Sequence, residues 1–306
     1  MSVRTLIVGS RGSRLALRQT EIALEALRSA HPEANFEVRT IRTTGDNTKA
    51  SLSEIGGRGV FVIEIERALL ACQIDIAVHS LKDLPTDETP GLAIAAVLPR
   101  EDPRDVLVSR RGASIEELPE EALVGTGSPR RAAQVLAMRP DVRIADIRGN
   151  VDTRMAKVES GDYDAVVLAA AGLARLGWLE RASQVFDADE MLPAPGQGAL
   201  AVQVRGDDAD AFTTVLSVDD TDTRAAVTAE RAFERRLGGG CHAAIAALAE
   251  VWEDRIWVRG LVADPVGAKL FRSEIDSAVA DPESAGLQLA EQLIGRGAGA
   301  LLDATA

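Results

Sequence analysis

Short apolar runs that each lead into a polar turn and then a helix recur along the first two thirds of this 306-residue chain. Thr5 to Gly9 is such a run, and a helical stretch from Leu15 to Ser29 follows it. Leu123 to Thr126 and Ala165 to Ala169 repeat the pattern. Buried strands that alternate with amphipathic helices indicate βαβ units and a mainly parallel sheet. We therefore expect an α/β protein with functional side chains at the carboxyl ends of its strands.

Two proline-containing stretches and one change of pattern predict the domain organisation. The stretch with Pro99 and Pro103, and the stretch from Pro193 to Leu200, are typical of crossings between two lobes. After Asp219, alternating strands and turns indicate a small antiparallel sheet, which a helix from Gly286 to Leu302 closes. The expected fold is two periplasmic-binding-protein-like lobes of doubly wound βα units joined by two crossings, plus a small C-terminal α+β domain. The predicted domains are residues 1–98 with 198–217, residues 99–197, and residues 218–306.

The charge of the chain limits its partners. Thirty-four Lys and Arg against 47 Asp and Glu give a net charge of −13. Nucleic acid and anionic membranes need a broad positive face, so we expect neither as a partner. Met1 to Ser10 lacks the apolar core of a signal peptide, and no apolar run approaches the roughly 18 residues of a membrane span. A cytoplasmic protein that binds anions through a local basic cluster is expected.

Cys241 follows three glycines, Gly238 to Gly240, at the end of a predicted helix from Asp222 to Leu237. Glycines let a ligand approach closely, which suits a thiol that a ligand must reach. The alternative is a free cysteine that packs as a small apolar side chain. Cys72 falls in a different predicted domain, so a disulfide is not expected. No Cys or His spacing indicates a metal site.

Arginines follow several of the predicted strands. A guanidinium binds two oxygens of a carboxylate or phosphate at once, which lysine cannot do. A set of arginines at corresponding points of successive βα units predicts one cleft for an anionic ligand, whereas the alternative is a series of solvated helix starts. The arginines are Arg11, Arg130, Arg131, Arg148, Arg154 and Arg175.

The predicted strand from Ile74 to Val78 runs directly into a polar segment, His79 to Pro85. Ligands bind beyond the carboxyl ends of strands in open α/β sheets, so this segment is a candidate active site. The alternative is that Lys82 and Asp83 form only a surface ion pair, which contributes little stability. A further alternative makes Lys82 a Schiff-base nucleophile.

With these stretches in place, the chain resembles the porphobilinogen deaminase family, also called hydroxymethylbilane synthases, nearly from end to end. Each motif is short, but their order along one chain is highly specific. The stretches that carry the resemblance are Gly56 to Phe61, Asp75 to Pro85, Arg100 to Asp105, Gly125 to Arg131, Arg148 to Asn150, Leu168 to Leu176, Leu192 to Ala199 and Leu237 to Cys241.

The resemblance implies a transferase of tetrapyrrole and heme biosynthesis. Such an enzyme condenses four porphobilinogen molecules, with loss of ammonia, into the linear tetrapyrrole hydroxymethylbilane. It implies that Cys241 carries a dipyrromethane cofactor through a thioether, and that Asp83 is the catalytic carboxylate near the pyrrole N–H. Every pyrrole brings an acetate and a propionate, so the partner is a small polycarboxylate, and a monomer is expected.

The resemblance also assigns binding residues. Those implied to hold the cofactor are Ser80, Lys82, Asp83, Thr126, Ser128, Arg130, Arg131, Arg148, Asn150 and Arg154. Those implied to meet the incoming or growing end of the chain are Arg11, Ser13, Gln19, Phe61, Arg175 and Gln197.

The chain departs from the family pattern at a few positions. Arg14 stands where proline is common, and Glu54 where lysine is frequent. The other departures are Gly127, Pro129 and His242. A two-lobed anion-binding receptor without catalysis is the alternative function, because it would share the arginines at the strand ends and the double crossing.

Overall fold

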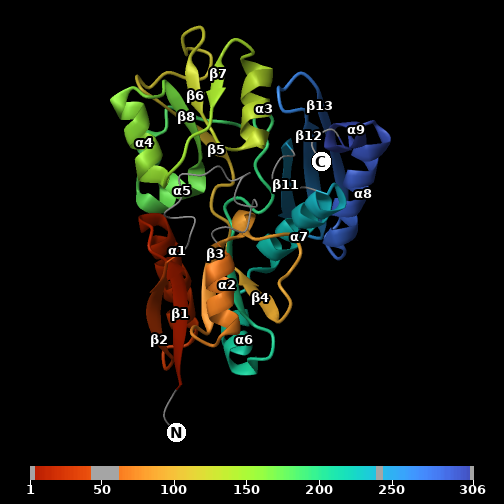
Figure 1. Cartoon of the computed structure of the whole chain (residues 1–306). Coiled ribbons are helices and arrows are strands. Elements are labelled where there is room, and N and C mark those ends of the chain that lie inside the picture. Colours follow the sequence, from red (N-terminus) through yellow and green to blue (C-terminus); the bar gives the residue numbers. More distant parts are fainter. Residues whose placement is uncertain (1–3, 43–61, 239–243, 304–306) are drawn as a thin grey trace. The chain divides into compact units, whose positions relative to one another are not determined.

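The structure is a computed structural model that describes residues 4–42, 62–238 and 244–303 (Figure 1). The chain forms two compact units. Met1–Glu101 and Ala199–Arg224 make up the first unit, and Asp102–Gly198 and Ala225–Ala306 make up the second. Among the described residues, no helix combines the length and the apolar character needed to cross a membrane.

The first unit contains one mixed sheet with the strand order β2-β1-β3-β10-β4. Strands β1 and β2 are parallel, as are β1 and β3, whereas β10 runs antiparallel to both β3 and β4. The strands are β1 (Thr5–Arg11), β2 (Asn35–Ile41), β3 (Ile76–Ser80), β4 (Leu92–Val97) and β10 (Leu200–Arg205). The helices are α1 (Arg14–Ala30), α2 (Ile63–Leu70), the 3-10 turn η2 (Leu81–Asp83) and α6 (Ala209–Leu216).

Helix α1 forms because its sequence supplies both a cap and an apolar stripe. The Ser13 hydroxyl accepts a hydrogen bond from the Ala16 N–H at 3.3 Å, which satisfies one N–H at the helix start. Leu24 and Leu27 are buried among core residues of the sheet such as Val8. The turn after β1 therefore has a fixed conformation, with Arg11 as the last residue of the strand.

The second unit contains a mixed sheet with the order β7-β6-β8-β5-β9. Strand β6 is parallel to β7 and β8, and β5 is antiparallel to β8 and β9. Its strands are β5 (Asp105–Ser109), β6 (Leu123–Gly125), β7 (Arg143–Ala145), β8 (Ala165–Ala169) and β9 (Gln184–Val185). The helices that belong to it are α3 (Pro129–Met138), α4 (Val151–Ser160), α5 (Ala170–Leu176) and the 3-10 turn η3 (Leu179–Arg181).

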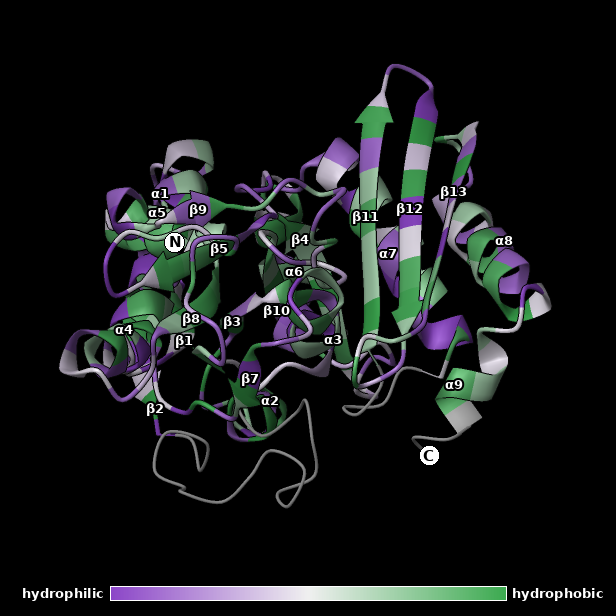
Figure 2. Ribbon diagram, turned by 90° about the horizontal axis from the view of Figure 1, so that it is seen from above, coloured by the Kyte–Doolittle hydropathy of each residue, from purple (hydrophilic) through white to green (hydrophobic). Residues whose placement is uncertain are grey.

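The same unit holds an antiparallel sheet of β11 (Ala244–Trp252), β12 (Arg255–Ala263) and β13 (Leu270–Ala278). Helices α8 (Pro282–Gly295) and α9 (Gly299–Asp303) accompany it, together with α7 (Thr221–Arg236) from Ala225 onward. Figure 2 shows hydrophobic and hydrophilic residues alternating along β12. This alternation puts one face of the sheet against a core of α7 and α8 residues. The fold therefore has two sheet-based lobes and a small C-terminal α+β part.

Gly260 of β12 allows this close packing. A Cβ atom at this position would lie 2.6 Å from the ring of Phe233 on α7, closer than side chains approach. Helix and strand therefore meet at the glycine, and any larger residue would push the ring away.

The predicted single helix from Gly286 to Leu302 is wrong. The structure has two helices, α8 and α9, with a break between Gly295 and Gly299. Gly297 has φ +102°, a left-handed conformation that ends helices and that glycine adopts at little cost. Helix α6 was not predicted from the sequence, although the Asp208 side chain caps it by accepting from the Ala211 N–H at 3.1 Å.

Candidate functional site: polar side chains at the strand ends

The carboxyl ends of β1 and β3 lie at one edge of the first sheet because these strands are parallel. Ser80, the last residue of β3, forms a side-chain hydrogen bond of 3.0 Å with Gln19 of α1. Gln19 is buried and Ser80 is half-buried. The structure thus brings together two predicted site residues that are 61 positions apart in the sequence.

Lys82 and Asp83 lie in the 3-10 turn η2 directly after β3. Leu81 and Leu84 are buried on either side of them, and the Leu81 N–H donates to the Ala199 carbonyl at 3.0 Å. These contacts fix the turn while leaving the Lys82 and Asp83 side chains half-exposed. The Asp83 side chain is therefore held in place by its buried neighbours and is partly accessible to solvent.

His79 precedes this turn and is buried in β3. Burial lowers the pKa of His79 to about 4, and the nearby positive charge of Arg11 acts in the same direction. The imidazole is therefore neutral at physiological pH. Arg11 is the last residue of β1, so its charge acts on a side chain of the neighbouring strand β3, which also carries Ser80.

In the second unit, strands β6, β7 and β8 are parallel, so their carboxyl ends also share one edge. The end of β6 leads through Thr126 to Ser128, the N-cap of α3. The Ser128 hydroxyl accepts from the Arg131 N–H at 3.4 Å, and Pro129 occupies the first turn. A serine cap followed by a proline in the first turn is a local pattern that favours a helix start, because proline has no N–H to satisfy there.

Arg130 and Arg131 of α3 are 4% and 7% exposed, and both bind Asp105, which is fully buried at the start of β5. Arg130 Nη1 donates to Asp105 Oδ2 at 2.6 Å. Arg131 donates to Asp105 Oδ1 through Nε at 3.0 Å and through Nη2 at 2.7 Å. Asp105 thus accepts hydrogen bonds from two guanidinium groups at once.

Burial alone would raise the pKa of Asp105. The charges and hydrogen bonds of Arg130 and Arg131 outweigh burial, so the pKa of the carboxyl lies well below its usual range. Sequence reasoning did not assign Asp105, although it begins an apolar strand inside one of the matched stretches. The signal that could have found it is a carboxylate that directly precedes a buried strand in a protein with an adjacent arginine pair.

Gln197 completes this cluster and is 0% exposed. Its Nε2 donates to the Pro103 carbonyl at 2.7 Å and to Asp105 Oδ1 at 3.0 Å. Its Oε1 lies 3.5 Å from Arg131 Nη2. The amide thus braces the pair of Asp105 and Arg131, and its predicted contact with the growing end of a substrate stays a prediction.

The other predicted residues of this unit are more accessible. Arg148 pairs with Asp146 at 2.8 Å, and Arg154 Nε donates to the Gly149 carbonyl at 2.8 Å. Asn150 is exposed at the N-cap position of α4. Arg175 Nη2 donates to the Gly198 carbonyl at 2.6 Å.

Some predictions fall outside the described residues. These are the attachment residue Cys241, the substrate residue Phe61, and the departures at Glu54 and His242. Within the described ranges, no group of three or more His, Cys, Asp or Glu side chains is placed to hold a metal ion.

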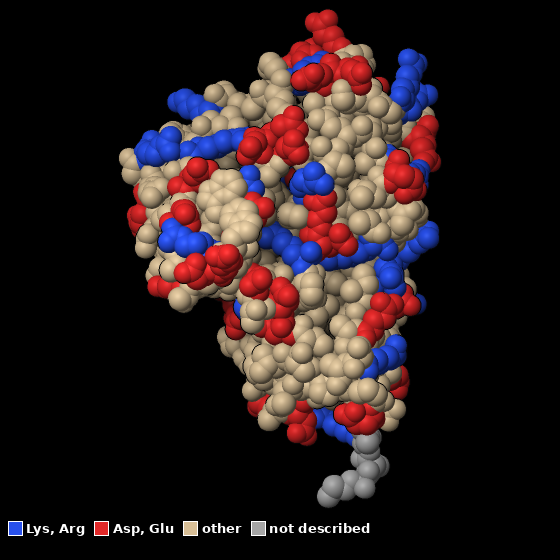
Figure 3. All heavy atoms as spheres, turned by 180° about the vertical axis from the view of Figure 1, so that it is seen from behind, with Lys and Arg blue, Asp and Glu red and all other residues tan. Residues whose placement is uncertain are grey.

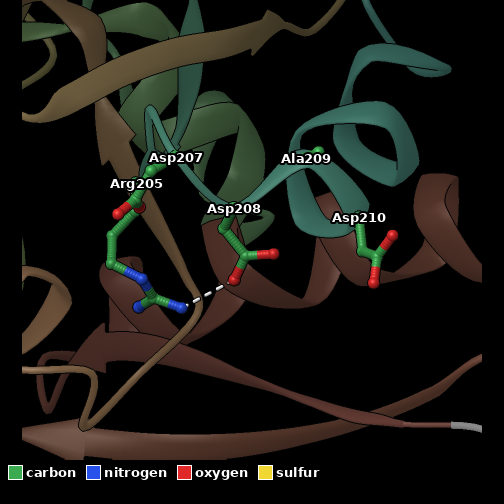
Figure 4. A pocket seen from close by; sticks show the side chains of 5 residues that line it. All are labelled: Arg205, Asp207, Asp208, Ala209 and Asp210. Carbon is green, nitrogen blue, oxygen red and sulfur yellow. Dashed lines mark hydrogen bonds and ion pairs between the residues drawn. The ribbon is translucent and has the colours of Figure 1, made fainter.

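A hollow of about 350 Å³ lies at the other end of β10, lined by Arg205, Asp207, Asp208, Ala209 and Asp210. Figure 4 shows Asp208 pointing toward Arg205, with an ion pair of 2.7 Å between them. Hydrogen bonds from Arg4 lower the pKa of Asp208 to about 2. In the sheet register Leu200 lies opposite Ser80, whereas Val204 lies opposite Ile76 at the start of β3, so this ion-pair network is at the edge away from Ser80.

Acidic and basic side chains are intermixed on the face that Figure 3 shows. The protein also has exposed ion pairs, for example Arg236 with Glu291 and Arg255 with Asp276. The buried arginines differ from these surface pairs. Arg130 and Arg131 combine two guanidinium groups with one carboxylate at a strand end, a composition that suits an anionic ligand.

Fold and site together define a class: an α/β protein with two sheet-based lobes, a small C-terminal α+β part, and arginines at strand ends that suit carboxylate ligands. Residues 6–213 match the family model "Porphobilinogen deaminase, dipyromethane cofactor binding domain", and residues 224–295 match "Porphobilinogen deaminase, C-terminal domain". The chain belongs to the porphobilinogen deaminase family.

Several curated relatives agree with this assignment. Porphobilinogen deaminase of Brevibacillus brevis is 46% identical over 297 residues, 96% of this chain and 96% of that protein. The Thermus thermophilus protein of the same name is 47% identical over 296 residues, 96% of this chain and 97% of that protein. A solved structure of the Bordetella pertussis BvgS VFT2 domain has a TM-score of 0.43 and 15% identity, covering 71% of this chain and 86% of that one, which is too distant for any conclusion.

Proposed function

We propose that this protein condenses four porphobilinogen molecules, with release of ammonia, into the linear tetrapyrrole hydroxymethylbilane. The observation that carries the proposal is the match of residues 6–213 and 224–295 to both domains of the family. The chain is a transferase of this family and has its dipyrromethane cofactor domain. The roles of its individual residues are proposals.

The described residues fit a ligand that carries several carboxylates. The cluster of Asp105, Arg130 and Arg131 places two guanidinium groups side by side on one carboxylate, and guanidinium groups are the side chains best suited to bind carboxylates. Four of the five N–H groups of Arg131 already donate to Asp105, Val167 and Gln197. The bonds to protein acceptors therefore orient the guanidinium before any ligand arrives, which lowers the entropy cost of binding.

The thiol of Cys241 is proposed to hold the dipyrromethane as a thioether. When bound, this group supplies the terminal pyrrole carbon to which the first substrate is joined. Arg130 and Arg131, with Thr126 and Ser128 beside them, are proposed to bind its carboxylates. Further proposed cofactor-binding residues are Ser80, Lys82, Arg148, Asn150 and Arg154.

Asp83 is the proposed catalytic residue. Loss of ammonia from porphobilinogen leaves positive charge on the pyrrole and its methylene carbon. A fixed carboxylate next to that charge stabilises the transition state and can accept the pyrrole N–H hydrogen bond. The buried Leu81 and Leu84 hold the turn that carries Asp83, so the carboxylate has a defined position.

The incoming or growing end of the product is proposed to meet Arg11, Ser13, Gln19, Phe61, Arg175 and Gln197. Ser13 and Gln19 already have structural partners, since Ser13 caps α1 and Gln19 binds Ser80. A monomeric state, a cytoplasmic location and the three-domain division given by the sequence are also proposals.

Denaturing mass spectrometry of the purified full-length protein tests the proposed function. A mass increase equal to two linked pyrrole units is expected, and peptide mapping should locate it on Cys241. Cys241→Ala should abolish the adduct and the activity, whereas Cys72→Ala should retain both. An active protein of unmodified mass would contradict the proposal, and ligand binding without turnover would favour the receptor alternative.

A further inference from the structure

Glu230 of α7 is a buried carboxylate that no role assigned above uses, and it is 0% exposed. Its Oε2 accepts from the Gly196 N–H at 2.7 Å, and its Oε1 accepts from the Ala249 N–H of β11 at 2.8 Å. A charged acceptor for backbone N–H groups forms stronger hydrogen bonds than a neutral one. The Glu230 side chain thus hydrogen-bonds both to Gly196, directly before Gln197, and to β11 of the antiparallel sheet.

Gly196 belongs to a segment, residues 192–198, that makes hydrogen bonds with three arginines. The Leu192 carbonyl accepts from Arg130 Nη1 at 2.8 Å. Gln197 contacts Asp105 and Arg131, and the Gly198 carbonyl accepts from Arg175 at 2.6 Å. Three of the arginines assigned to ligand binding therefore contact this one segment.

The segment is held from both of its sides within the second unit. Gln134 of α3 accepts from the Leu192 N–H at 2.8 Å, and the Pro193 carbonyl accepts from the Ala247 N–H of β11 at 3.1 Å. Gly196 has φ +72°, a left-handed conformation in which residues other than glycine are strained. This turn sets the direction in which the Gly196 N–H points. Glu230 is the acceptor that fixes this N–H.

We infer that Glu230 is a positioning residue for the ligand-binding arginines. Glu230 fixes the N–H of Gly196, and the next residue, Gln197, contacts Asp105 and Arg131. Through these contacts, Glu230 orients the arginine side chains that are proposed to bind carboxylates. This inference rests on the proposed function, because it concerns the binding of a polycarboxylate by those arginines.

The first test measures the hydrogen bonds themselves. In Glu230→Gln the amide retains one acceptor oxygen, so only one of the two N–H groups can keep its bond. Hydrogen exchange of the full-length protein, followed by mass spectrometry, should show about tenfold faster exchange in peptides from 192–198 or 244–252. Phe233→Leu, which alters the same helix in the core of α7, α8 and β12, is the matched control.

The second test separates positioning from stability. Glu230→Gln should raise KM for porphobilinogen roughly fivefold with a smaller change in kcat, and should lower the fraction of chains that carry the two-pyrrole adduct. Phe233→Leu is expected to lower the thermal midpoint and to leave KM and the adduct fraction unchanged.

A double-mutant cycle tests the path to the arginines. Glu230 and Asp105 belong to one network through Gly196 and Gln197, so the effects of Glu230→Gln and Asp105→Asn on KM should deviate from additivity by at least about twofold. Phe233→Leu combined with Asp105→Asn should be additive.

The outcomes are distinct. Two results would overturn the positioning role of Glu230. One is unchanged hydrogen exchange in both peptides of Glu230→Gln; the other is a KM and an adduct fraction equal to those of Phe233→Leu, together with an additive double-mutant cycle. Either result would leave the proposed function intact. A wild-type protein without a two-pyrrole adduct would overturn the proposed function and, with it, the inference. Faster hydrogen exchange in Glu230→Gln, together with a raised KM and a non-additive cycle, would support the positioning role of Glu230.

Discussion

The replacement Asp105→Asn tests the buried arginine cluster most directly. Asp105 is 0% exposed and accepts hydrogen bonds from Arg130, Arg131 and Gln197. Asparagine has nearly the same shape but no charge, and its NH₂ group would face guanidinium N–H groups. The variant therefore leaves two buried guanidinium groups without their carboxylate.

Removal of one partner from a buried ion pair costs about 3–5 kcal/mol, because the other charge remains buried without compensation. At roughly 2 °C per kcal/mol for a chain of this size, the thermal midpoint should fall by about 6–10 °C. Asp102→Asn is the matched control, since Asp102 is partly exposed and pairs with Arg104 at 2.7 Å. The Arg104 side chain is 41% exposed, so water screens this pair; its removal should cost about 1 kcal/mol and shift the midpoint by about 2 °C.

The assay is thermal unfolding of the full-length protein in a Cys241→Ala background. This background removes the proposed covalent cofactor, because a ligand that binds only the folded state would itself raise the midpoint. Equal midpoints for the Asp105→Asn and Asp102→Asn proteins would refute the reasoning, since they would show that the buried carboxylate does not stabilise the cluster.

The pH dependence of stability, compared between wild type and Asp105→Asn, gives a second test of the cluster. The pKa of Asp105 is lower in the folded state than its unfolded value of about 3.9, so its contribution to stability is complete above that value. The contribution decreases as pH falls below the unfolded value, and it is lost once pH has fallen through the lower folded pKa. The stability difference between wild type and Asp105→Asn should therefore stay constant from about pH 8 to 5 and shrink below about pH 4. A difference that already shrinks between about pH 7 and 5 would contradict the assignment.

Three further predictions concern other parts of the protein. Asp83→Asn should lower kcat by about 100-fold or more, whereas the exposed neighbour Asp87→Asn should leave it unchanged in a steady-state assay. Gly260→Ala should lower the thermal midpoint by the equivalent of about 1–3 kcal/mol because its Cβ would lie 2.6 Å from Phe233, and a neutral result would show that the ring can move. Burial lowers the pKa of His79 to about 4, so NMR should show no protonation of its imidazole above about pH 5. The contribution of this neutral imidazole to the free energy of unfolding should be lost as pH falls from about 6.5 to 4.

Local sequence determined much of the fold. Ala165–Ala169 forms the strand that its apolar run predicts, and Ser128 and Pro129 begin a helix as their cap chemistry predicts. Such features depend on residues only a few positions apart, so they can be recognised without knowledge of distant contacts. The order of the motifs along the chain also indicated the family, because the motifs are local stretches of sequence.

The resemblance named the arginines, but it did not reveal what orients them. Asp105 meets Arg130 and Arg131 from 25 and 26 positions away, and it meets Gln197 from 92 positions away. Glu230 reaches Gly196 across 34 positions. The sequence does not show which of the 47 acidic residues binds which partner, because that choice depends on burial and on contacts between distant residues.

Strand pairing was also decided by the tertiary structure. The apolar run that becomes β10 reads as a strand, but its position between β3 and β4 depends on side chains about 100 or more positions away in the sequence. The sequence by itself thus determined the elements, the family and the residue types of the site. Only the folded chain decided which buried acid neutralises and orients which arginine, because that choice depends on distance and on exclusion of water rather than on local pattern.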